Sequence, residues 1–169
     1  MRKLRLILLF LTVVAINIKA QSSSPDFRHI TESDGLSSNQ VRAIIQDRFG
    51  YVWMGTDQGL DRYDGTVFRN YVFGDSFRGS TVLSLHEDGP VIWIGTDKGL
   101  VSYSYAADSV EPFLEMTEEG LRISGEVMTL DMDKDNNLWI ATMGQGVFRY
   151  SQKNNSLDQF LFPRCNDEL

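Results

Sequence analysis

The sequence is poor in the residues that build most catalytic, metal and disulfide-bonded sites. It has one cysteine, Cys165, and only two histidines, His29 and His86, which lie far apart along the chain. A single cysteine excludes an internal disulfide, and the pattern predicts no metal centre and no cofactor. Proline is also scarce, with 4 residues against 14 glycines. That balance is typical of short strands joined by tight turns.

No apolar run is long enough to span a membrane. Three basic residues within 1–5 precede an apolar stretch at 6–18, and Ala20 follows it. A basic start, a short apolar run and a small residue are typical of a secretory signal peptide, whereas a span needs about 20 apolar residues. We therefore predict a signal peptide at 1–20, cleaved after Ala20, and a periplasmic or otherwise exported protein. An uncleaved signal anchor is the alternative.

Basic residues are few once that segment is removed. Residues 1–20 carry four bases and no acids, so their removal lowers the formal net charge from −7 to −11. Duplex nucleic acid and anionic membranes bind proteins through basic surfaces. The composition therefore predicts no nucleic-acid partner. Membrane attachment is expected only through an uncleaved anchor or a missing region beyond Leu169.

One pattern of about 40 residues occurs three times from Leu36 onward. Each copy contains Val-x-x-Ile/Leu-x-x-Asp, then a tryptophan, one or two glycines and a tyrosine. The tryptophans are 40 and 46 residues apart, which is the spacing of propeller blades built from four short strands. The recurring positions, which we interpret as structural, are Asp47, Asp88, Asp133, Trp53, Trp93, Trp139, Gly55, Gly95, Gly59, Gly99, Gly146, Tyr63, Tyr103 and Tyr150.

Within the first copy the pattern predicts strands at 41–46, 52–56, 60–63 and 68–72. The sequences VWMGT, VIWIGT and LWIAT are apolar at consecutive positions, as expected of strands that neighbouring blades cover on both faces. We therefore predict an all-β fold, a partial β-propeller of three four-stranded blade repeats after a signal peptide. The divisions are a signal peptide at 1–20, an N-terminal segment that could form a strand at 21–35, blades at 36–73, 74–115 and 116–162, and a tail at 163–169.

Three blades are fewer than the four to eight that usually close a propeller. The third repeat is therefore expected to present an uncovered apolar face. Two explanations remain open. The reading frame is truncated near 163–169, or other chains complete the ring.

Each copy resembles the two-component regulator propeller repeat, whose pattern runs VxxIxxDxxGxxWIGTxxGLxxY. The segment at 30–65 also resembles the start of the exported sensor region of Bacteroidetes hybrid two-component system proteins. The resemblance, which covers 27–160, implies propellers outside the inner membrane and, elsewhere in such proteins, a membrane span and a cytoplasmic histidine kinase. It also implies sensing of glycan breakdown products. Kinase and receiver motifs are absent from this sequence, so we predict that this chain is not an enzyme.

Other candidate sites have simpler explanations. The run at 131–137 spaces carboxylates as a calcium loop does, but it lacks that loop's glycine and bidentate glutamate. Tryptophans could stack on sugars, but their recurrence at one position favours packing between blades. Asp57 and Asp97 could line a ligand surface, although a turn-forming role is favoured. The sequence predicts no catalytic residue and leaves the ligand-binding residues open.

These features favour an exported sensory or ligand-recognition propeller module of a two-component signal transduction protein. The expected partners are an oligosaccharide and further propeller blades of the same or another chain. The alternative is a free-standing exported scaffold that self-association completes as a six-blade ring. A propeller glycan hydrolase or lyase ranks last, because no acid, base and stabilising group recur together outside turn positions.

Overall fold

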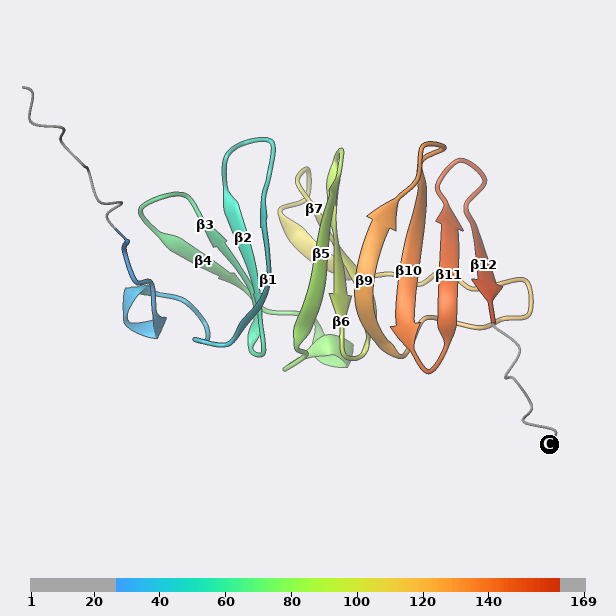
Figure 1. The fold of residues 1–169 in the computed structure, drawn as a ribbon, viewed down its shortest axis with the longest axis horizontal. Helices are drawn as coiled ribbons and strands as arrows, with labels where there is room; N and C mark the ends of the chain where they lie inside the picture. Colours follow the sequence, from blue (N-terminus) through green and yellow to red (C-terminus); the bar gives the residue numbers. More distant parts are fainter. Residues whose placement is uncertain (1–26, 162–169) are drawn as a thin grey trace, which may run out of the picture.

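A computed structural model describes residues 27–161, which form three separate four-stranded antiparallel sheets (Figure 1). The predicted signal peptide at 1–20 and tail at 163–169 lie outside these residues. Two short 3-10 helices, η1 (Glu32–Asp34) and η2 (Asp75–Phe77), precede the first and second sheets. Within residues 27–161 no helix is long and apolar enough to cross a bilayer. The fold prediction of three four-stranded blades is confirmed.

Each sheet is a simple meander in which consecutive strands pair. The first contains β1 (Val41–Gln46), β2 (Val52–Thr56), β3 (Gly59–Tyr63) and β4 (Phe68–Tyr71). The second contains β5 (Val82–Asp88), β6 (Val91–Thr96), β7 (Gly99–Ser104) and β8 (Ser109–Pro112). The third contains β9 (Glu126–Met132), β10 (Asn137–Met143), β11 (Gly146–Ser151) and β12 (Ser156–Phe160).

The three sheets stand side by side in chain order (Figure 1). The first strand of each sheet packs beside the first strand of the next, so that β1 contacts β5 and β5 contacts β9. Because successive side chains of a strand point to opposite faces, every sheet has two distinct faces. We call the face that carries the repeat tryptophan the tryptophan face, and the one that carries the repeat tyrosine the tyrosine face.

The hydrophobic core consists of two layers, each between a tryptophan face and the tyrosine face of the following sheet. The first layer joins Trp53, Leu60, Tyr71 and Phe73 to Val82, Ile92, Ile94, Val101 and Tyr103. The second joins Trp93 and Leu100 to Ile123, Val127, Leu130, Leu138, Ile140, Phe148, Tyr150 and Leu157. No sheet within the described residues covers the tryptophan face of the third sheet, so β10 is fully buried only at Leu138 and Ile140.

A glycine in the second strand lets neighbouring sheets approach closely. The β1–β2 and β5–β6 ladders are irregular between Val41 and Ala43 and between Val82 and Ser84. Val82 lies where a side chain on Gly55 would be, and Val127 lies where one on Gly95 would be. The glycine in the MGT and IGT sequences is therefore required by the valine of the following blade.

Candidate functional site

The repeat tryptophan of the first sheet lies at the centre of a closed interface. Trp53 is fully buried, and its ring centroid lies 4.6 Å from that of Tyr103 in the next sheet and 5.4 Å from that of Tyr71 in its own. Its indole Nε1 donates a hydrogen bond of 2.8 Å to Asp47. Both ends of the indole are thus held, one by aromatic packing and one by a carboxylate.

Asp47 connects the first hairpin to both sheets. Its Oδ1 accepts the backbone N–H groups of Phe49 and Tyr51, each at 2.9 Å, which closes the β1–β2 turn. Its Oδ2 accepts the Trp53 indole and, at 3.0 Å, the hydroxyl of Tyr105 from the second sheet. Burial, followed by this hydrogen bond to Asp47, raises the pKa of Tyr105.

The second interface repeats this arrangement with different side chains. The Trp93 ring lies 5.8 Å from Phe113 and 5.9 Å from Tyr150, in edge-to-face orientations. Its Nε1 donates to Asp88 at 3.3 Å, and Gln152 of the third sheet also donates to Asp88. Gln152 occupies the place of Tyr105, two residues after the repeat tyrosine.

A second connector lies in the hairpin between the third and fourth strands of each following sheet. Asp108 and Asn155 both adopt a φ of 50°, and each accepts the hydroxyl of its own repeat tyrosine, at 2.9 and 2.8 Å. Each also contacts a residue that precedes its own sheet in the chain. Asp108 accepts the Tyr71 hydroxyl at 2.9 Å and Arg69 at 2.5 Å, and Asn155 donates to Glu115 at 3.1 Å.

The charge of Asp108 is stabilised by these contacts. Desolvation opposes the charged form, but hydrogen bonds from Tyr103, Tyr71 and Arg69 outweigh it and lower the pKa of Asp108. Desolvation is the main cause that raises the pKa of Tyr71 and of Tyr103. The joint between the first two sheets is therefore an anionic carboxylate held by neutral phenols and an arginine.

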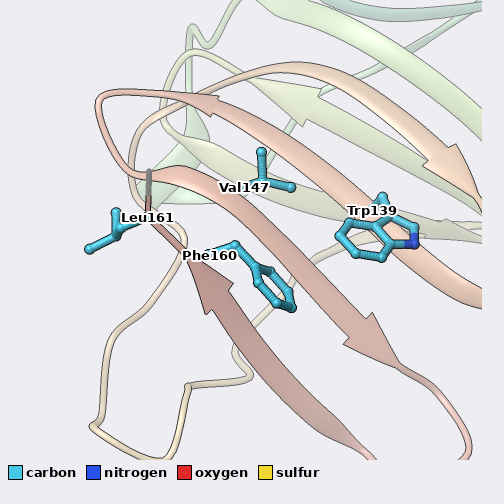
Figure 2. A pocket seen from close by; sticks show the side chains of 4 residues that line it. All are labelled: Trp139, Val147, Phe160 and Leu161. Carbon is cyan, nitrogen blue, oxygen red and sulfur yellow. The ribbon is translucent and has the colours of Figure 1, made fainter. Parts of the chain in front are cut away.

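The tryptophan face of the third sheet carries the same kinds of groups, and no sheet formed by residues 27–161 covers it. Trp139 is half-buried, its Nε1 donates to Asp133 at 2.8 Å, and its ring stacks 5.6 Å from Phe160. A hollow of about 410 Å³ opens here, lined by Trp139, Val147, Phe160 and Leu161. Figure 2 shows Phe160 between Leu161 and Trp139, with Val147 beside them. This open face is the candidate functional surface that the structure identifies.

Asp133 closes its hairpin as Asp47 does. The Asn137 side chain, the Asn137 backbone N–H, the Trp139 indole and the Asp135 backbone N–H lower the pKa of Asp133 to about 2. Asp133 is thus engaged in turn formation within the 131–137 run. Among residues 27–161, no three carboxylate, histidine or cysteine side chains are arranged to hold a metal ion.

The repeated hairpin glycines have positive φ angles. Gly59 and Gly99 each have a φ of 128°, and Gly146 has a φ of 74°. A Cβ at Gly99 would lie 2.7 Å from the carbonyl oxygen of Ile123, and one at Gly146 would lie 2.5 Å from that of Phe160. All three positions therefore favour glycine by backbone conformation, and Gly99 and Gly146 also require it for space.

Asp57 and Asp97 occupy the turns between the second and third strands. Asp97 accepts the backbone N–H of Thr81 at 3.0 Å, and in the third sheet Gln145 accepts those of Ser124 and Gly125 at 2.9 and 2.7 Å. Asp97 and Gln145 thus hold the loops that precede the second and third sheets. The Oδ1 atom of Asp57 is buried and has no hydrogen-bond partner within the described part of the chain.

Sequence reasoning missed the side chains that connect one blade to the previous one. Tyr105, Gln152, Asp108 and Asn155 differ in type between copies, so a search for identical residues does not find them. The sequence feature that could have revealed them is the length of the hairpin between the third and fourth strands. Tyr103 pairs with Val110, whereas Tyr63 pairs with Phe68. The β3–β4 hairpin is therefore two residues shorter than the β7–β8 hairpin.

The family described as "Two component regulator propeller" matches residues 35–58. The first blade is a two-component regulator propeller repeat. The second and third blades carry the same pattern of aspartate, tryptophan, glycine and tyrosine. The matched family is a regulator propeller and not a catalytic domain, which supports the expectation that the repeats themselves are not enzymatic.

Proteins of two-component signalling are among those that the chain resembles. Over 58 residues the chain is 45% identical to histidine kinase P4 of Formosa agariphila, a match that covers 34% of this chain and 4% of that protein. The extracellular domain described as belonging to a hybrid two-component system of B. thetaiotaomicron is 25% identical, with a TM-score of 0.69, over 79% of this chain and 20% of that one.

A second extracellular domain, described as belonging to a one-component system of B. thetaiotaomicron, shares the fold. It is 23% identical, with a TM-score of 0.66, and the match covers 80% of this chain and 18% of that one. The chain thus spans about a fifth of the solved domains that it matches. Because these neighbours are extracellular, they agree with the expected export, although the predicted signal peptide lies outside the described residues.

Proposed function

We propose that the chain is an exported ligand-recognition module of a two-component signal transduction protein, and that its ligands are glycan-derived. The observation that carries the proposal is the match, over 79% of the chain, to the extracellular domain of a hybrid two-component system. The propeller match at 35–58 supports the same assignment independently. Such a module acts by binding, which shifts the equilibrium between signalling states and needs no chemical step.

The buried tryptophans of the first two blades cannot serve as stacking platforms for sugar rings. Trp53 and Trp93 lie between sheets and present no free ring to a ligand. Ligand contacts would instead come from one rim, where the turns between second and third strands meet the connecting loops at 72–81 and 113–125. Loops held on a rigid scaffold commonly carry recognition.

The rim offers exposed polar side chains of the kind that bind neutral sugars. Gln58 and Lys98 are exposed at adjacent blades, and Lys98 donates to the backbone carbonyl of Arg78 at 2.7 Å. Amide and ammonium groups donate hydrogen bonds to sugar hydroxyls. The acidic composition, with a formal net charge of −7, favours neutral over anionic oligosaccharides.

Calorimetric titration of the purified chain with a panel of neutral and acidic oligosaccharides tests the proposal. We expect at least one neutral oligosaccharide to bind, and Gln58→Ala to weaken that binding several-fold. Lys134→Ala, in the β9–β10 turn at the opposite rim, is the matched control and should bind as the parent does. Absence of binding across the panel, or equal effects of both variants, would reject a glycan-binding rim.

The self-associating scaffold remains the second candidate function because the third sheet has an open tryptophan face. Phe160 is exposed there beside the half-buried Trp139, and copies of the chain could bury them against each other. Sedimentation equilibrium distinguishes the two functions. A monomer over a wide concentration range favours the sensory module, whereas a folded dimer favours the scaffold.

A further inference from the structure

We propose that the joint between the second and third sheets is a binding site for a guanidinium group that another molecule supplies. The site consists of three mutually packed aromatic rings, those of Trp93, Phe113 and Tyr150. Two carboxylates complete it, Glu111 in β8 and Glu115 in the loop that follows β8. The site and its ligand class differ from those of the glycan-binding rim, and the inference does not depend on that rim.

The joint between the first two sheets shows the same ring cluster with a guanidinium in place. The rings of Trp53, Tyr71 and Tyr103 lie 4.6 to 5.4 Å from one another. The guanidinium carbon of Arg62 lies 5.6 Å from the Trp53 ring centroid and 5.8 Å from that of Tyr71. Its Nη1 also donates to the Tyr103 hydroxyl at 3.4 Å. Because a cation is attracted to the π electrons of a ring, this cluster holds a cation that belongs to the first sheet.

The equivalent residue of the third sheet is also an arginine, whereas that of the second sheet is a serine. Arg149 is the β11 partner of Trp139, and its guanidinium carbon lies 6.0 Å from the Trp139 ring and 5.7 Å from the Phe160 ring. In the second sheet the β7 partner of Trp93 is Ser102, which is half-buried. A serine is too short to cover the rings as the two arginines do.

The ring cluster of the second joint is more accessible than that of the first. Its ring centroids lie 4.9 to 5.9 Å apart, and no arginine or lysine among residues 27–161 lies over any of the three rings. Trp93 is 7% exposed and Tyr150 is 9% exposed, whereas Trp53 is 0% and Tyr103 is 1% exposed. Phe113 is only partly buried. Solvent therefore reaches the cluster in which the covering arginine is replaced by serine.

The charges of the two joints are of opposite sign at equivalent positions. In the first joint Arg69 and Arg62 lie 2.5 and 3.9 Å from Asp108, so two cations share one carboxylate. Arg69 is the β4 partner of Arg62. In the second sheet the β8 partner of Ser102 is Glu111. Both arginines of the first joint are thus absent from the second, and a carboxylate stands in the place of one of them.

Glu115 brings a second negative charge to the ring cluster. It accepts a hydrogen bond of 3.1 Å from Asn155 of the third sheet. Burial is the main cause that raises the pKa of Tyr150, and the negative charge of Glu115 adds to it, so this charge acts at the rings. Neither Glu111 nor Glu115 forms an ion pair with a base in the part of the chain that the structure describes. Accessible rings and unneutralised carboxylates together attract a cation from solution.

A guanidinium fits this site better than a metal ion or an ammonium group. Within residues 27–161 no three carboxylate, histidine or cysteine side chains are arranged to hold a metal ion. An ammonium group is compact and strongly hydrated, whereas a guanidinium is planar, weakly hydrated and able to stack on aromatic rings. A small guanidino compound and an arginine side chain of a partner protein both present this group.

Titration of the full chain with methylguanidinium, followed by fluorine NMR of incorporated 5-fluorotryptophan, tests the proposal. The Trp93 resonance, assigned by its loss in Trp93→Phe, should shift saturably with a Kd on the order of 10 mM. The Trp53 resonance should not move, because Arg62 already covers that ring. Urea is planar and similar in size but uncharged, and it should shift neither resonance. A glycine-flanked arginine peptide that binds more tightly than methylguanidinium would identify a protein arginine as the source, and one that binds no more tightly would identify a small guanidino compound.

Substitutions at the serine and at one carboxylate sharpen the test. Ser102→Arg supplies the guanidinium from the chain itself and should weaken methylguanidinium binding about tenfold. Ser102→Ala leaves the rings uncovered and should bind as the parent does. Ser33→Arg adds the same charge at an exposed serine of η1, and it is the matched control that should also bind as the parent does. Glu111→Gln should weaken binding about threefold, and circular dichroism confirms that each variant is folded.

Three results would overturn the proposal. The first is a Trp93 resonance that does not shift saturably, or that urea shifts equally. The second is an equal shift of all three tryptophan resonances, which would indicate a general effect of the added salt. The third is a folded Ser102→Arg variant that binds methylguanidinium as tightly as the parent, because the group would then bind somewhere other than on the ring cluster.

Discussion

At the level of single residues, the pairing of a hairpin aspartate with a tryptophan indole recurs in all three sheets. Asp47 and Asp133 each close a turn through two backbone N–H groups and bind an indole at 2.8 Å. Asp88 stands in a shorter turn and binds its indole at 3.3 Å. The aspartate therefore connects local turn chemistry to the packing between sheets.

Replacement of Asp47 should destabilise the chain more than replacement of Asp88. Asp47→Ala removes a buried carboxylate that accepts four hydrogen bonds and leaves the Trp53 N–H buried without a partner. We expect a loss of about 3 kcal/mol in the free energy of unfolding. Asp88→Ala should cost about 1 kcal/mol. Urea denaturation measures both, and equal losses would contradict the role given to Asp47.

Asp133 should make stability depend on acid pH. Its pKa of about 2 in the folded chain lies below its ordinary value of 3.8, so its contribution is present above about pH 4 and is lost as the pH falls towards 2. Asp133→Asn removes this titration. The parent should lose stability relative to the variant between pH 4 and pH 2 in urea denaturation midpoints, and parallel pH profiles would contradict the assignment.

At the level of strands and sheets, the close approach of neighbouring blades depends on the second-strand glycine. A Cβ on Gly95 would lie 2.6 Å from Val127 Cγ1 and 2.8 Å from the Val127 carbonyl oxygen. The backbone oxygen cannot move away as a side chain can. The packing of the second and third sheets therefore allows little adjustment at this point.

Gly95→Ala should be destabilising although alanine is compatible with a strand. Overpacking against Val127 is expected to cost about 2 kcal/mol. Gly74→Ala, where an added Cβ meets no atom within 4 Å, is the matched control and should change stability little. Thermal unfolding followed by circular dichroism measures the two variants, and similar midpoints would show that the sheets can separate to accept the methyl group.

The strands of the first blade follow directly from its sequence. The predicted strands at 41–46 and 52–56 coincide with β1 and β2, because turns with aspartate and glycine separate β1 from β2 and end β2. The predicted strand at 60–63 begins one residue earlier, at Gly59, and the one predicted at 68–72 ends one residue earlier, at Tyr71. Local turn chemistry therefore defines the inner strands better than the outer ones.

Contacts between sheets were less predictable from the sequence. Repetition indicated that the tryptophans pack between blades, but it could not show that Tyr105 and Gln152 bind the aspartate of the preceding blade. Nor could it show that Asp61 is buried against Ser37. These contacts join residues that are 24 to 64 positions apart and differ between copies, so no periodic signal marks them.

At the level of the whole molecule, the chain is a linear stack with two unlike ends. Each sheet contacts only its neighbours along the stack, which is the organisation of repeat proteins. The N-terminal segment covers the tyrosine face at one end through Ser37 and Asp61. Within residues 27–161, no sheet covers the tryptophan face at the other end. The described part of the stack therefore has a direction.

Incorporation of 5-fluorotryptophan, with fluorine NMR in the presence of a soluble paramagnetic reagent, tests this account most directly. Two resonances, from Trp53 and Trp93, should stay sharp, because their rings lie between sheets. The third should broaden strongly and disappear in the Trp139→Phe variant. Equal broadening of all three resonances, or loss of a sharp resonance in that variant, would contradict face-to-face packing of the sheets and the open third face.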